Sequence, residues 1–290
     1  MRVTKTSPKY LDNQCRSMCH RDRSPNSEPA RSRVRACRSL SNVRCLSTSS
    51  APHCMRPSRP RRHCTGESSM SSKAKAQSTQ PYTEQASTLI ARYESISFED
   101  SHRDELHVLP TTPGRVLDIG AGSGRDAAWL AERGHSVLAV EPTAPMRAAA
   151  MQLHPSSAIE WLDDALPDLT VVHSRGERFD LILISAVWMH LDEDERAAAM
   201  PRVASLLSLN GVLLLSLRHG PIPVGRRIFD VSGNETIALA AQCGLGLVLN
   251  VEAKSVQTTN LVAGVTWTKL GFKAGSEGDR AGSETRSVLG

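Results

Sequence analysis

Three glycines at alternate positions, Gly120, Gly122 and Gly124, follow an apolar run that contains the acidic residue Asp118. Glycine allows backbone dihedral angles closed to other residues and lets a ligand approach the main chain. A second acidic residue, Glu141, ends the next apolar run. This spacing predicts a ligand site in which two carboxylates flank a turn of accessible backbone.

The glycine turn does not match the motifs that bind phosphate groups. A P-loop needs a lysine after its last glycine, and none follows here. A dinucleotide fingerprint GxGxxG needs a third glycine at the position that Arg125 occupies. Asp118 is also a poor neighbour for a pyrophosphate, whereas its carboxylate suits a cationic amino group. The turn therefore favours a ligand with an ammonium group.

The elements that position these residues alternate along the chain. We expect strands at 115–119, 136–141, 158–162, 179–187, 212–218, 245–252 and 264–271. We expect helices at 84–93, 100–108, 124–133, 144–153, 166–174, 192–208 and from about 233 to 243. Apolar strands that alternate with helices are typical of a parallel sheet covered on both faces. The sequence predicts an α/β fold, a doubly wound, mostly parallel sheet of seven strands, with one antiparallel strand inserted at an edge because no helix is expected between the last two strands.

Local signals set some of these boundaries. Asn210-Gly211 is a favourable stop for the helix at 192–208. Ser232 with Glu235 predicts a capping box for the helix that follows. The acidic run at 192–195 resembles a metal cluster, but the dipole of a helix start explains it more simply.

Charge divides the 290 residues into two parts. Residues 1–69 carry a net charge of +11, and the remainder carries −6. We expect 1–75 to be a disordered Arg/Ser/Cys-rich extension, 80–272 to be the globular domain, and 273–290 to be a flexible tail. Three explanations of the extension stay open: a transit peptide, a basic arm for nucleic acid, or a non-functional extension that precedes a true start at Met70.

The composition of the domain also limits its environment. Six of the seven cysteines lie in the extension, which leaves Cys243 in the domain. A domain with one cysteine has no internal disulfide, which suits a reducing cytoplasm. No apolar run approaches the roughly 18 residues that span a bilayer, and the net negative charge makes nucleic acid a poor partner. We expect a cytoplasmic domain without membrane, nucleic-acid or metal partners; its oligomeric state is open.

The stretch "VLDIGAGSG" followed by "VLAVEPT" resembles the cofactor site of class I (Rossmann-like) S-adenosylmethionine-dependent methyltransferases, of the small-molecule type. The similarity runs over roughly residues 90–272. The resemblance implies a Rossmann-like methyltransferase fold, S-adenosyl-L-methionine as cofactor, and an acidic residue that orients the cofactor's ammonium group. It implies the following cofactor-binding residues: Asp118, Gly120, Ala121, Gly122, Ser123, Gly124, Glu141, Met146, Asp164, Ala165 and Ser185.

The resemblance also gives these residues roles. Asp118 is expected at the ammonium group, Glu141 at both ribose hydroxyls, and Asp164 at the adenine amino group. Met146 is expected against the adenine, although ordinary packing on the sheet is an equal alternative. Ser185 is expected on the far side of the cofactor.

Residues for the methyl acceptor are less defined. His190 follows the fourth expected strand, and Arg218 and His219 follow the fifth, so these three are the candidates for catalysis. Methyl transfer from a sulfonium depends mainly on alignment, so a general base matters only for a protonated acceptor. The motifs of DNA amino- and cytosine C5-methylating enzymes are missing. We therefore predict methylation of an O or N atom of a small molecule.

Three rival functions remain on the sequence. An RNA methyltransferase would use the basic extension as an arm, and a non-catalytic protein would bind S-adenosylmethionine and serve as a partner. An NAD-linked oxidoreductase is the third. The segment before the first strand resembles the helical lid that small-molecule methyltransferases place over the acceptor, and Tyr93, Phe98 and His102 are expected at that pocket, although core packing is an equal alternative.

Overall fold

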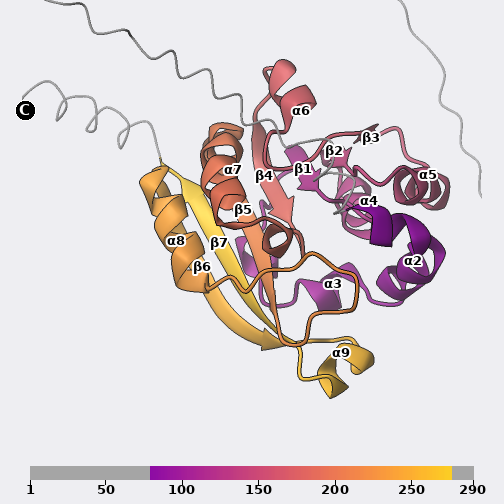
Figure 1. The fold of residues 1–290 in the computed structure, drawn as a ribbon. Helices are drawn as coiled ribbons and strands as arrows, with labels where there is room; N and C mark the ends of the chain where they lie inside the picture. The colour runs from indigo at the N-terminus through magenta and orange to yellow at the C-terminus, as the bar shows by residue number, and fades with distance from the viewer. Residues whose placement is uncertain (1–78, 276–290) are drawn as a thin grey trace, which may run out of the picture. The chain divides into compact units, whose positions relative to one another are not determined.

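Seven strands form one sheet in the order β3-β2-β1-β4-β5-β7-β6 (Figure 1). The computed structural model describes residues 79–275, so the expected extension at 1–75 and nearly all of the expected tail at 273–290 lie outside the described residues. The strands are β1 (Arg115–Ile119), β2 (Ser136–Val140), β3 (Ile159–Leu162), β4 (Phe179–Ile184), β5 (Leu207–His219), β6 (Leu245–Lys254) and β7 (Thr266–Ala274).

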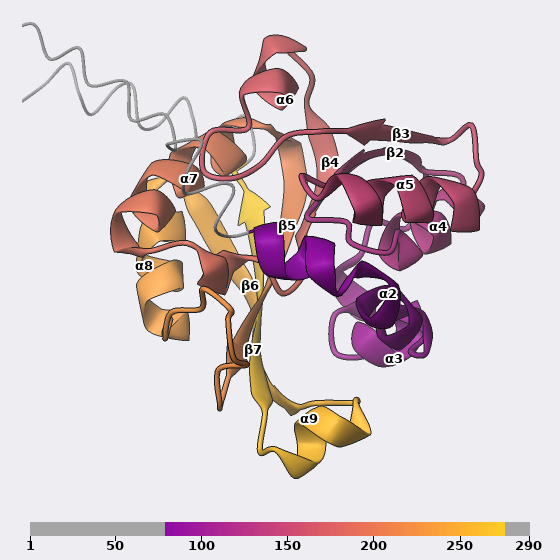
Figure 2. The same ribbon diagram turned by 45° about the vertical axis from the view of Figure 1, so that its right-hand side comes forward.

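Helices connect these strands. They are α2 (Ala86–Glu94), α3 (Phe98–Ser101), α4 (Arg125–Glu132), α5 (Ala144–Leu153), α6 (Thr170–Ser174), α7 (Glu193–Ser205), α8 (Gly233–Gln242) and α9 (Thr258–Val262), with 3₁₀ turns at Leu106–Val108 and Trp188–His190. Residues 79–84 are helical as well. In Figure 2, α7 and α8 lie beside the β5 to β6 part of the sheet, and α4 and α5 lie beside β2 and β3.

The strand directions confirm the predicted fold class. β1 pairs in parallel with β2 and β4, and the parallel pairing continues to β3 on one side and to β5 on the other. β7 is antiparallel to both β5 and β6. The antiparallel strand is thus the last one, and it lies one place in from the edge, because β6 takes the outermost position.

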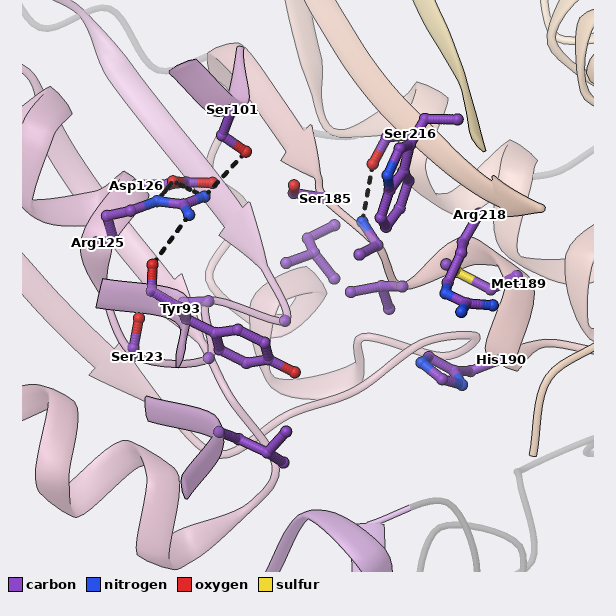
Figure 3. Close-up of a pocket in the computed structure, with 18 of the residues that line it drawn as sticks. Tyr93, Ser101, Ser123, Arg125, Asp126, Ser185, Met189, His190, Ser216 and Arg218 are labelled. Atoms are coloured by element: carbon purple, nitrogen blue, oxygen red, sulfur yellow. Dashed lines mark hydrogen bonds and ion pairs between the residues drawn. The ribbon is translucent and has the colours of Figure 1, made fainter. Parts of the chain in front are cut away.

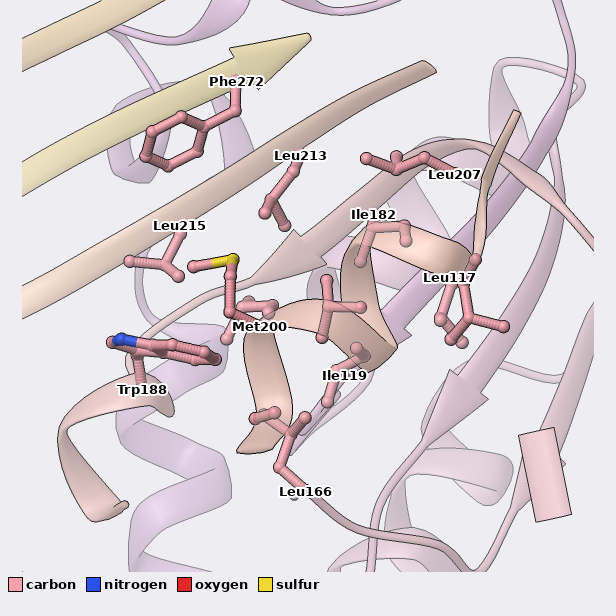
Figure 4. Close-up of a cluster of buried hydrophobic side chains, with 14 of the residues drawn as sticks. Leu117, Ile119, Leu166, Ile182, Trp188, Met200, Leu207, Leu213, Leu215 and Phe272 are labelled. Atoms are coloured by element: carbon pink, nitrogen blue, oxygen red, sulfur yellow. The ribbon is translucent and has the colours of Figure 1, made fainter. Parts of the chain in front are cut away.

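Alternating side chains divide the core between the two faces of the sheet. In β1, Leu117 and Ile119 belong to a cluster that includes Met200 of α7 (Figure 4), whereas Val116 packs on the opposite face with Leu130 of α4. Successive strand residues point to opposite faces. Asp118 therefore shares the face of Val116, on the side that α4 covers.

The boundary between α7 and β5 differs from the prediction. The helix ends at Ser205, and β5 already begins at Leu207, which pairs with Phe179. Asn210 and Gly211 lie within the strand rather than at a helix end, with Asn210 at a φ of 61°. A Cβ on Gly211 would lie 2.9 Å from the carbonyl oxygen of Phe179. This glycine is needed for the close approach of β4, and not as a helix stop.

Two other local predictions are corrected. The short helix α9 lies between β6 and β7, where none was expected. The complete capping box belongs to Asp192 and Glu195 at the start of α7. Ser232 does accept a hydrogen bond from the Glu235 amide, but the Glu235 carboxylate binds Arg196 instead of returning to the cap.

Within the segment before β1, Phe98 of α3 packs against the sheet, whereas α2 packs against α5. Leu89 and Ile90 of α2 pack against Met146 of α5. In the part of the chain that is described, no helix has both the length and the apolar character needed to cross a membrane.

Candidate active site

A cavity of about 660 Å³ opens at the carboxyl ends of the parallel strands. That volume is typical of small-molecule sites, and this end of a doubly wound sheet is where ligands bind. Most residues expected from the sequence line it, namely Asp118, Gly120, Ala121, Gly122, Ser123, Glu141, Met146, Asp164, Ala165, Ser185, His190 and Arg218. Gly124 and His219 do not.

The glycine turn brings its backbone close to the cavity. The amides of Gly120 and Ala121 both donate to the carbonyl of Val140, at 2.8 and 3.0 Å, which fixes the turn over the end of β2. Gly120 has a φ of 77°, and a Cβ there would lie 2.4 Å from a methyl carbon of Val187. Gly122 has a φ of 59° and faces the Tyr93 ring. Glycine is required at both positions by the backbone angle.

Gly124 has a different role from the one expected. It is the N-cap of α4 with a φ of 86°. A Cβ at this position would meet the Trp161 ring at 2.9 Å and the His154 ring at 3.1 Å. The third glycine therefore allows α4 to pack against β3 and α5, and it does not line the cavity.

Glu141 is buried at the end of β2. Its Oε2 accepts from the Gly122 amide at 2.9 Å, and its Oε1 accepts from the Thr143 amide at 2.7 Å. Burial raises the pKa of Glu141, against the lowering effect of these bonds. The carboxylate thus ties the glycine turn to the start of α5. A carboxylate offers about four acceptor positions, so about two remain for a ligand.

Asp118 is the least satisfied polar group of the site. It is 2% exposed, and its Oδ2 is a buried atom without a hydrogen-bond partner. Burial, followed by the negative charge of Asp126, raises the pKa of Asp118 to about 8. An unpartnered buried carboxyl group is costly, and a cationic ligand group would satisfy it.

A buried polar network lies next to Asp118. His102 contacts Glu105 through Nδ1 at 2.6 Å and Asp126 through Nε2 at 2.9 Å. Burial lowers the pKa of His102, but the two carboxylates outweigh it and raise the pKa to about 9. Lys269 of β7 also reaches Glu105, at 3.3 Å. The network joins the segment after α3 to the first turn of α4 and to the sheet.

Arg125 links the same turn to the lid formed by α2 and α3. It donates to the Asp126 carboxylate at 2.7 Å, to the Tyr93 carbonyl at 3.3 Å and to the Ser101 hydroxyl at 3.3 Å (Figure 3). Of the three lid residues expected at the acceptor, Tyr93 and His102 line the cavity. Phe98 instead stacks between His102 and Trp129, away from it.

The adenine side of the expected site is also assembled. Met146 lines the cavity and packs on α2 rather than on the sheet. Asp164 accepts from the amides of Ala165, Val171 and Val172 at 2.7 to 3.0 Å, so it holds the start of α6. About one acceptor position on Asp164 remains for a ligand.

Beyond β4 the chain turns sharply into the cavity. Ala186 has a φ of 60°, a strained value for a residue with a Cβ, and its amide donates to the Ser216 hydroxyl of β5 at 2.9 Å (Figure 3). This bond holds Ser185 and Val187 at the cavity wall. Trp188 is fully buried in the core and does not line the cavity.

His190 has both ring nitrogens occupied. Its Nδ1 donates to the Arg227 carbonyl at 2.6 Å, so its Nε2 accepts from the Tyr82 hydroxyl at 2.8 Å. Burial and the charges of Arg226 and Arg227 lower the pKa of His190, which keeps the ring neutral. Burial raises the pKa of Tyr82 to about 12. Both nitrogens of His190 are thus in hydrogen bonds, and the Tyr82 hydroxyl is the group of this pair that a ligand can contact.

Arg218 and His219, the two catalytic candidates at the end of β5, lie on opposite faces of the strand. Arg218 points into the cavity opposite Tyr93 (Figure 3). His219 points to the other face of the strand, where its Nε2 contacts the Thr268 hydroxyl at 2.8 Å. Neighbouring strand residues face opposite sides of the sheet, so His219 does not reach the cavity.

Sequence reasoning missed several residues of the site. Tyr82 lies 108 positions before its partner His190, and no local pattern connects them. Arg92 of α2 lines the cavity from an amphipathic helix that has no motif. Lys269 had a signal, because a lysine inside the apolar run of β7 must find a buried partner.

Comparisons with known proteins agree with this geometry. Residues 116–211 match the sequence model of a family described as "Methyltransferase domain". An uncharacterized methyltransferase of Mycobacterium tuberculosis (strain ATCC 25618 / H37Rv) is 32% identical over 113 residues, which cover 37% of this chain and 40% of that protein. One of Geobacillus thermodenitrificans is 28% identical over 145 residues, or 48% of this chain and 60% of that protein. The chain thus matches well under two thirds of these relatives' lengths.

Solved structures share the fold. The 1,6-didemethyltoxoflavin-N1-methyltransferase of Burkholderia thailandensis, with bound 1,6-didemethyltoxoflavin and S-adenosylhomocysteine, has a TM-score of 0.56 at 20% identity and covers 70% of this chain and 90% of its own. The N-methyltransferase NodS of Bradyrhizobium japonicum, in complex with S-adenosylhomocysteine, has a TM-score of 0.54 at 17% identity. The match covers 68% of this chain and 98% of NodS. The [4+2]-cyclase SpnF has a TM-score of 0.53 at 13% identity, and the match covers 68% of this chain and 95% of SpnF.

Residues 116–211 thus match a methyltransferase domain, and the described residues share the Rossmann-like fold of class I S-adenosylmethionine-dependent methyltransferases. The resemblance in the sequence and the cofactor it implied are thereby confirmed. The residues present fit that cofactor, because the orphaned Oδ2 of Asp118 needs a cation and the turn at Gly122 leaves its backbone bare toward the cavity.

Proposed function

We propose that this protein transfers a methyl group from S-adenosylmethionine to an O or N atom of a small molecule that binds in the same cavity. The observation that carries the proposal is the continuity of this cavity, which runs from the glycine turn to His190 and Arg218 beneath the lid. A lid tied down by Arg125 leaves room for a small acceptor rather than a polymer. A solved structure with the same fold holds the small molecule 1,6-didemethyltoxoflavin together with S-adenosylhomocysteine, which supports a small acceptor.

The cofactor-side roles follow from the unused hydrogen-bonding capacity of the acids. Asp118 pairs with the ammonium group, Glu141 accepts from the ribose hydroxyls, and Asp164 accepts from the adenine amino group. When bound, S-adenosylmethionine supplies a methyl group on a positively charged sulfur. The Tyr93 ring lies against Gly122 at this part of the cavity.

The acceptor side needs a base only if the acceptor atom carries a proton. In that case Tyr82 takes the proton while its own proton passes to Nε2 of His190, along the bond already present. The remaining work is alignment of the acceptor against the methyl group. We place this reaction in the cytoplasm, since Cys243, the one cysteine among the described residues, is a free thiol.

The direct test incubates the full chain with isotopically labelled S-adenosylmethionine and a small-molecule cell extract, followed by mass spectrometry. The expected result is a labelled small molecule together with S-adenosylhomocysteine. Binding without transfer would favour a non-catalytic partner or another chemistry on this fold, as the name of the cyclase illustrates. Label found only in RNA would favour the RNA methyltransferase.

A further inference from the structure

Several arginines reach the acceptor half of the cavity, and they differ in how their charge is neutralised. Arg125 pairs with Asp126, and Arg227 pairs with Asp192 and Glu195. Arg218 and Arg92 line the same cavity. Among residues 79–275, no acidic side chain forms an ion pair with either of them.

The contacts of these two residues are neutral. Arg218 is half-buried at the end of β5 and donates through Nη1 to the Pro221 carbonyl at 2.8 Å. The guanidinium of Arg92 lies 5.7 Å from the centre of the Tyr93 ring. Each therefore keeps most of its five N–H donors for another partner.

The two guanidinium groups also act on one another. Burial lowers the pKa of Arg218, and the positive charge of Arg92 lowers it further. A third guanidinium, that of Arg226, lies 3.8 Å from the centre of the Tyr82 ring and donates to the neutral side chain of Gln85 at 3.3 Å. Arg92 is exposed, whereas Arg218 and Arg226 are half-buried, so the like charges cost free energy chiefly at these two, and a bound anion would offset that cost.

The acids of the cavity do not supply that anion. Asp118, Glu141 and Asp164 lie on the cofactor side, where the proposed roles occupy them. Glu252 is exposed at the end of β6 and forms no ion pair with Arg92 or Arg218. The other acids of the cavity, Asp100, Asp104, Glu105 and Asp126, already pair with Arg103, Lys269, His102 or Arg125, so Arg218 and Arg92 remain free to bind an anionic ligand.

We propose that the methyl acceptor is a small organic anion whose carboxylate or phosphate group binds between Arg218 and Arg92. Planar guanidinium groups with free N–H pairs match both anions. Tyr82, whose ring Arg226 covers, lines the same cavity and is the group that would take a proton from the atom to be methylated. This inference rests on the proposed function and adds the acceptor's charge to it.

The test uses the full chain saturated with S-adenosylhomocysteine and matched pairs of probes. One pair is benzoate and benzamide, and the other is phenyl phosphate and phenol. Affinities are measured by ligand-observed NMR or calorimetry. We expect benzoate or phenyl phosphate, or both, to bind about tenfold or more tightly than the matched neutral compound. The anion that binds more tightly identifies the anion class.

Variants localise the effect. Arg218→Gln and Arg92→Gln should each weaken binding of that acid by about tenfold or more, while S-adenosylhomocysteine affinity stays at the wild-type value and shows that the variants fold. Arg178→Gln is the matched control, because Arg178 is an exposed arginine outside the cavity that donates to the Glu177 carbonyl.

The inference is overturned if neither acid binds, if the neutral probes bind equally well, or if both arginine variants retain wild-type affinity for the acid. Failure of the proposed function gives a different result. In that case S-adenosylhomocysteine itself fails to bind in the first titration, or no labelled product forms from any extract.

Discussion

At the scale of single residues, the site is defined by how much hydrogen-bonding capacity each buried carboxylate has left. Glu141 and Asp164 already hold the backbone of the turn and of α6, and both still have acceptor positions. Asp118 has a buried oxygen without any partner. The three acids therefore fit a ligand with several donors and one positive charge.

Glu141→Ala should weaken binding of S-adenosylhomocysteine by about 1–3 kcal/mol, because it removes charge-assisted hydrogen bonds and frees the turn at Gly122. Calorimetry measures this change. Glu177→Ala, which removes a carboxylate near the opposite end of the sheet, is the control and should bind as the wild type does. Unchanged affinity in Glu141→Ala would remove this residue from the ribose site.

Asp118 makes cofactor affinity depend on pH. With its pKa raised to about 8, the free protein holds Asp118 largely protonated at neutral pH, and pairing with an ammonium group requires that proton to leave. Affinity for S-adenosylhomocysteine should rise between pH 6 and pH 8, by up to about tenfold per pH unit. Titrations at four pH values in this range test the prediction.

Asp118→Asn provides the matched control for that slope. The amide cannot titrate, so its affinity should be weaker and nearly independent of pH over the same range. An equal slope in wild type and Asp118→Asn would assign the pH dependence to another group.

At the scale of elements, the lid is held by charges rather than by apolar packing alone. His102 lies between Glu105 and Asp126, and Arg125 joins the same turn to Tyr93 and Ser101. Broken buried ion pairs cost more than surface pairs, because a charge is left without a partner. The stability of the lid should therefore depend on His102.

His102→Gln should lower the free energy of unfolding by about 3 kcal/mol at neutral pH, since it removes the buried cation that Glu105 and Asp126 share and leaves them only Lys269 and Arg125, respectively. The pKa of His102 is raised above its ordinary value, to about 9, so its contribution is full below about pH 6.5 and is lost as the pH rises through 9. Urea unfolding at pH 6, 7.5 and 9.5 should show this decline in wild type.

His107→Gln is the control for that series, because His107 is an exposed histidine in the adjacent 3₁₀ turn. It should unfold as the wild type does at every pH. If His102→Gln followed the same curve as His107→Gln, the buried network would contribute nothing to stability.

The elements also mark what a single sequence can predict. The strands through β4 and the glycine turn could be predicted, because apolar runs and glycines are local signals. The role of Gly124 could not, since it depends on Trp161 and His154 from other elements. The early start of β5 likewise depends on pairing with Phe179, which overrides the helix-stop signal of Asn210-Gly211.

At the scale of the whole molecule, one cavity has a cofactor half and an acceptor half. A sequence motif predicts the cofactor half, whereas no motif predicts the acceptor half. Most of the cofactor residues lie in or next to the stretch 116–143, which carries a motif. Of the acceptor residues, Tyr82 and Arg92 come from the helical segment before β1 and Arg218 from the end of β5, so only the fold brings them together. The chemistry of the acceptor therefore could not be predicted from local sequence patterns.

Deletion of residues 1–69 tests whether the site needs this part of the chain. A variant without these residues should bind S-adenosylhomocysteine with wild-type affinity and methylate the same small molecules at the same rate, because every residue of the proposed site lies at or beyond position 82. Labelled-cofactor assays on small molecules and on total RNA compare the two chains. Activity on RNA that disappears with the extension would support the basic-arm alternative.

The central claim is that the crevice beside Asp118 and the glycine turn holds an amino-acid sulfonium nucleotide and not a dinucleotide. Calorimetry on one protein preparation, titrated with S-adenosylhomocysteine and separately with NAD, tests it most directly. We predict saturable binding of S-adenosylhomocysteine at one site per chain, and no heat or competition from NAD. Saturable binding of NAD that S-adenosylhomocysteine fails to displace would contradict the account.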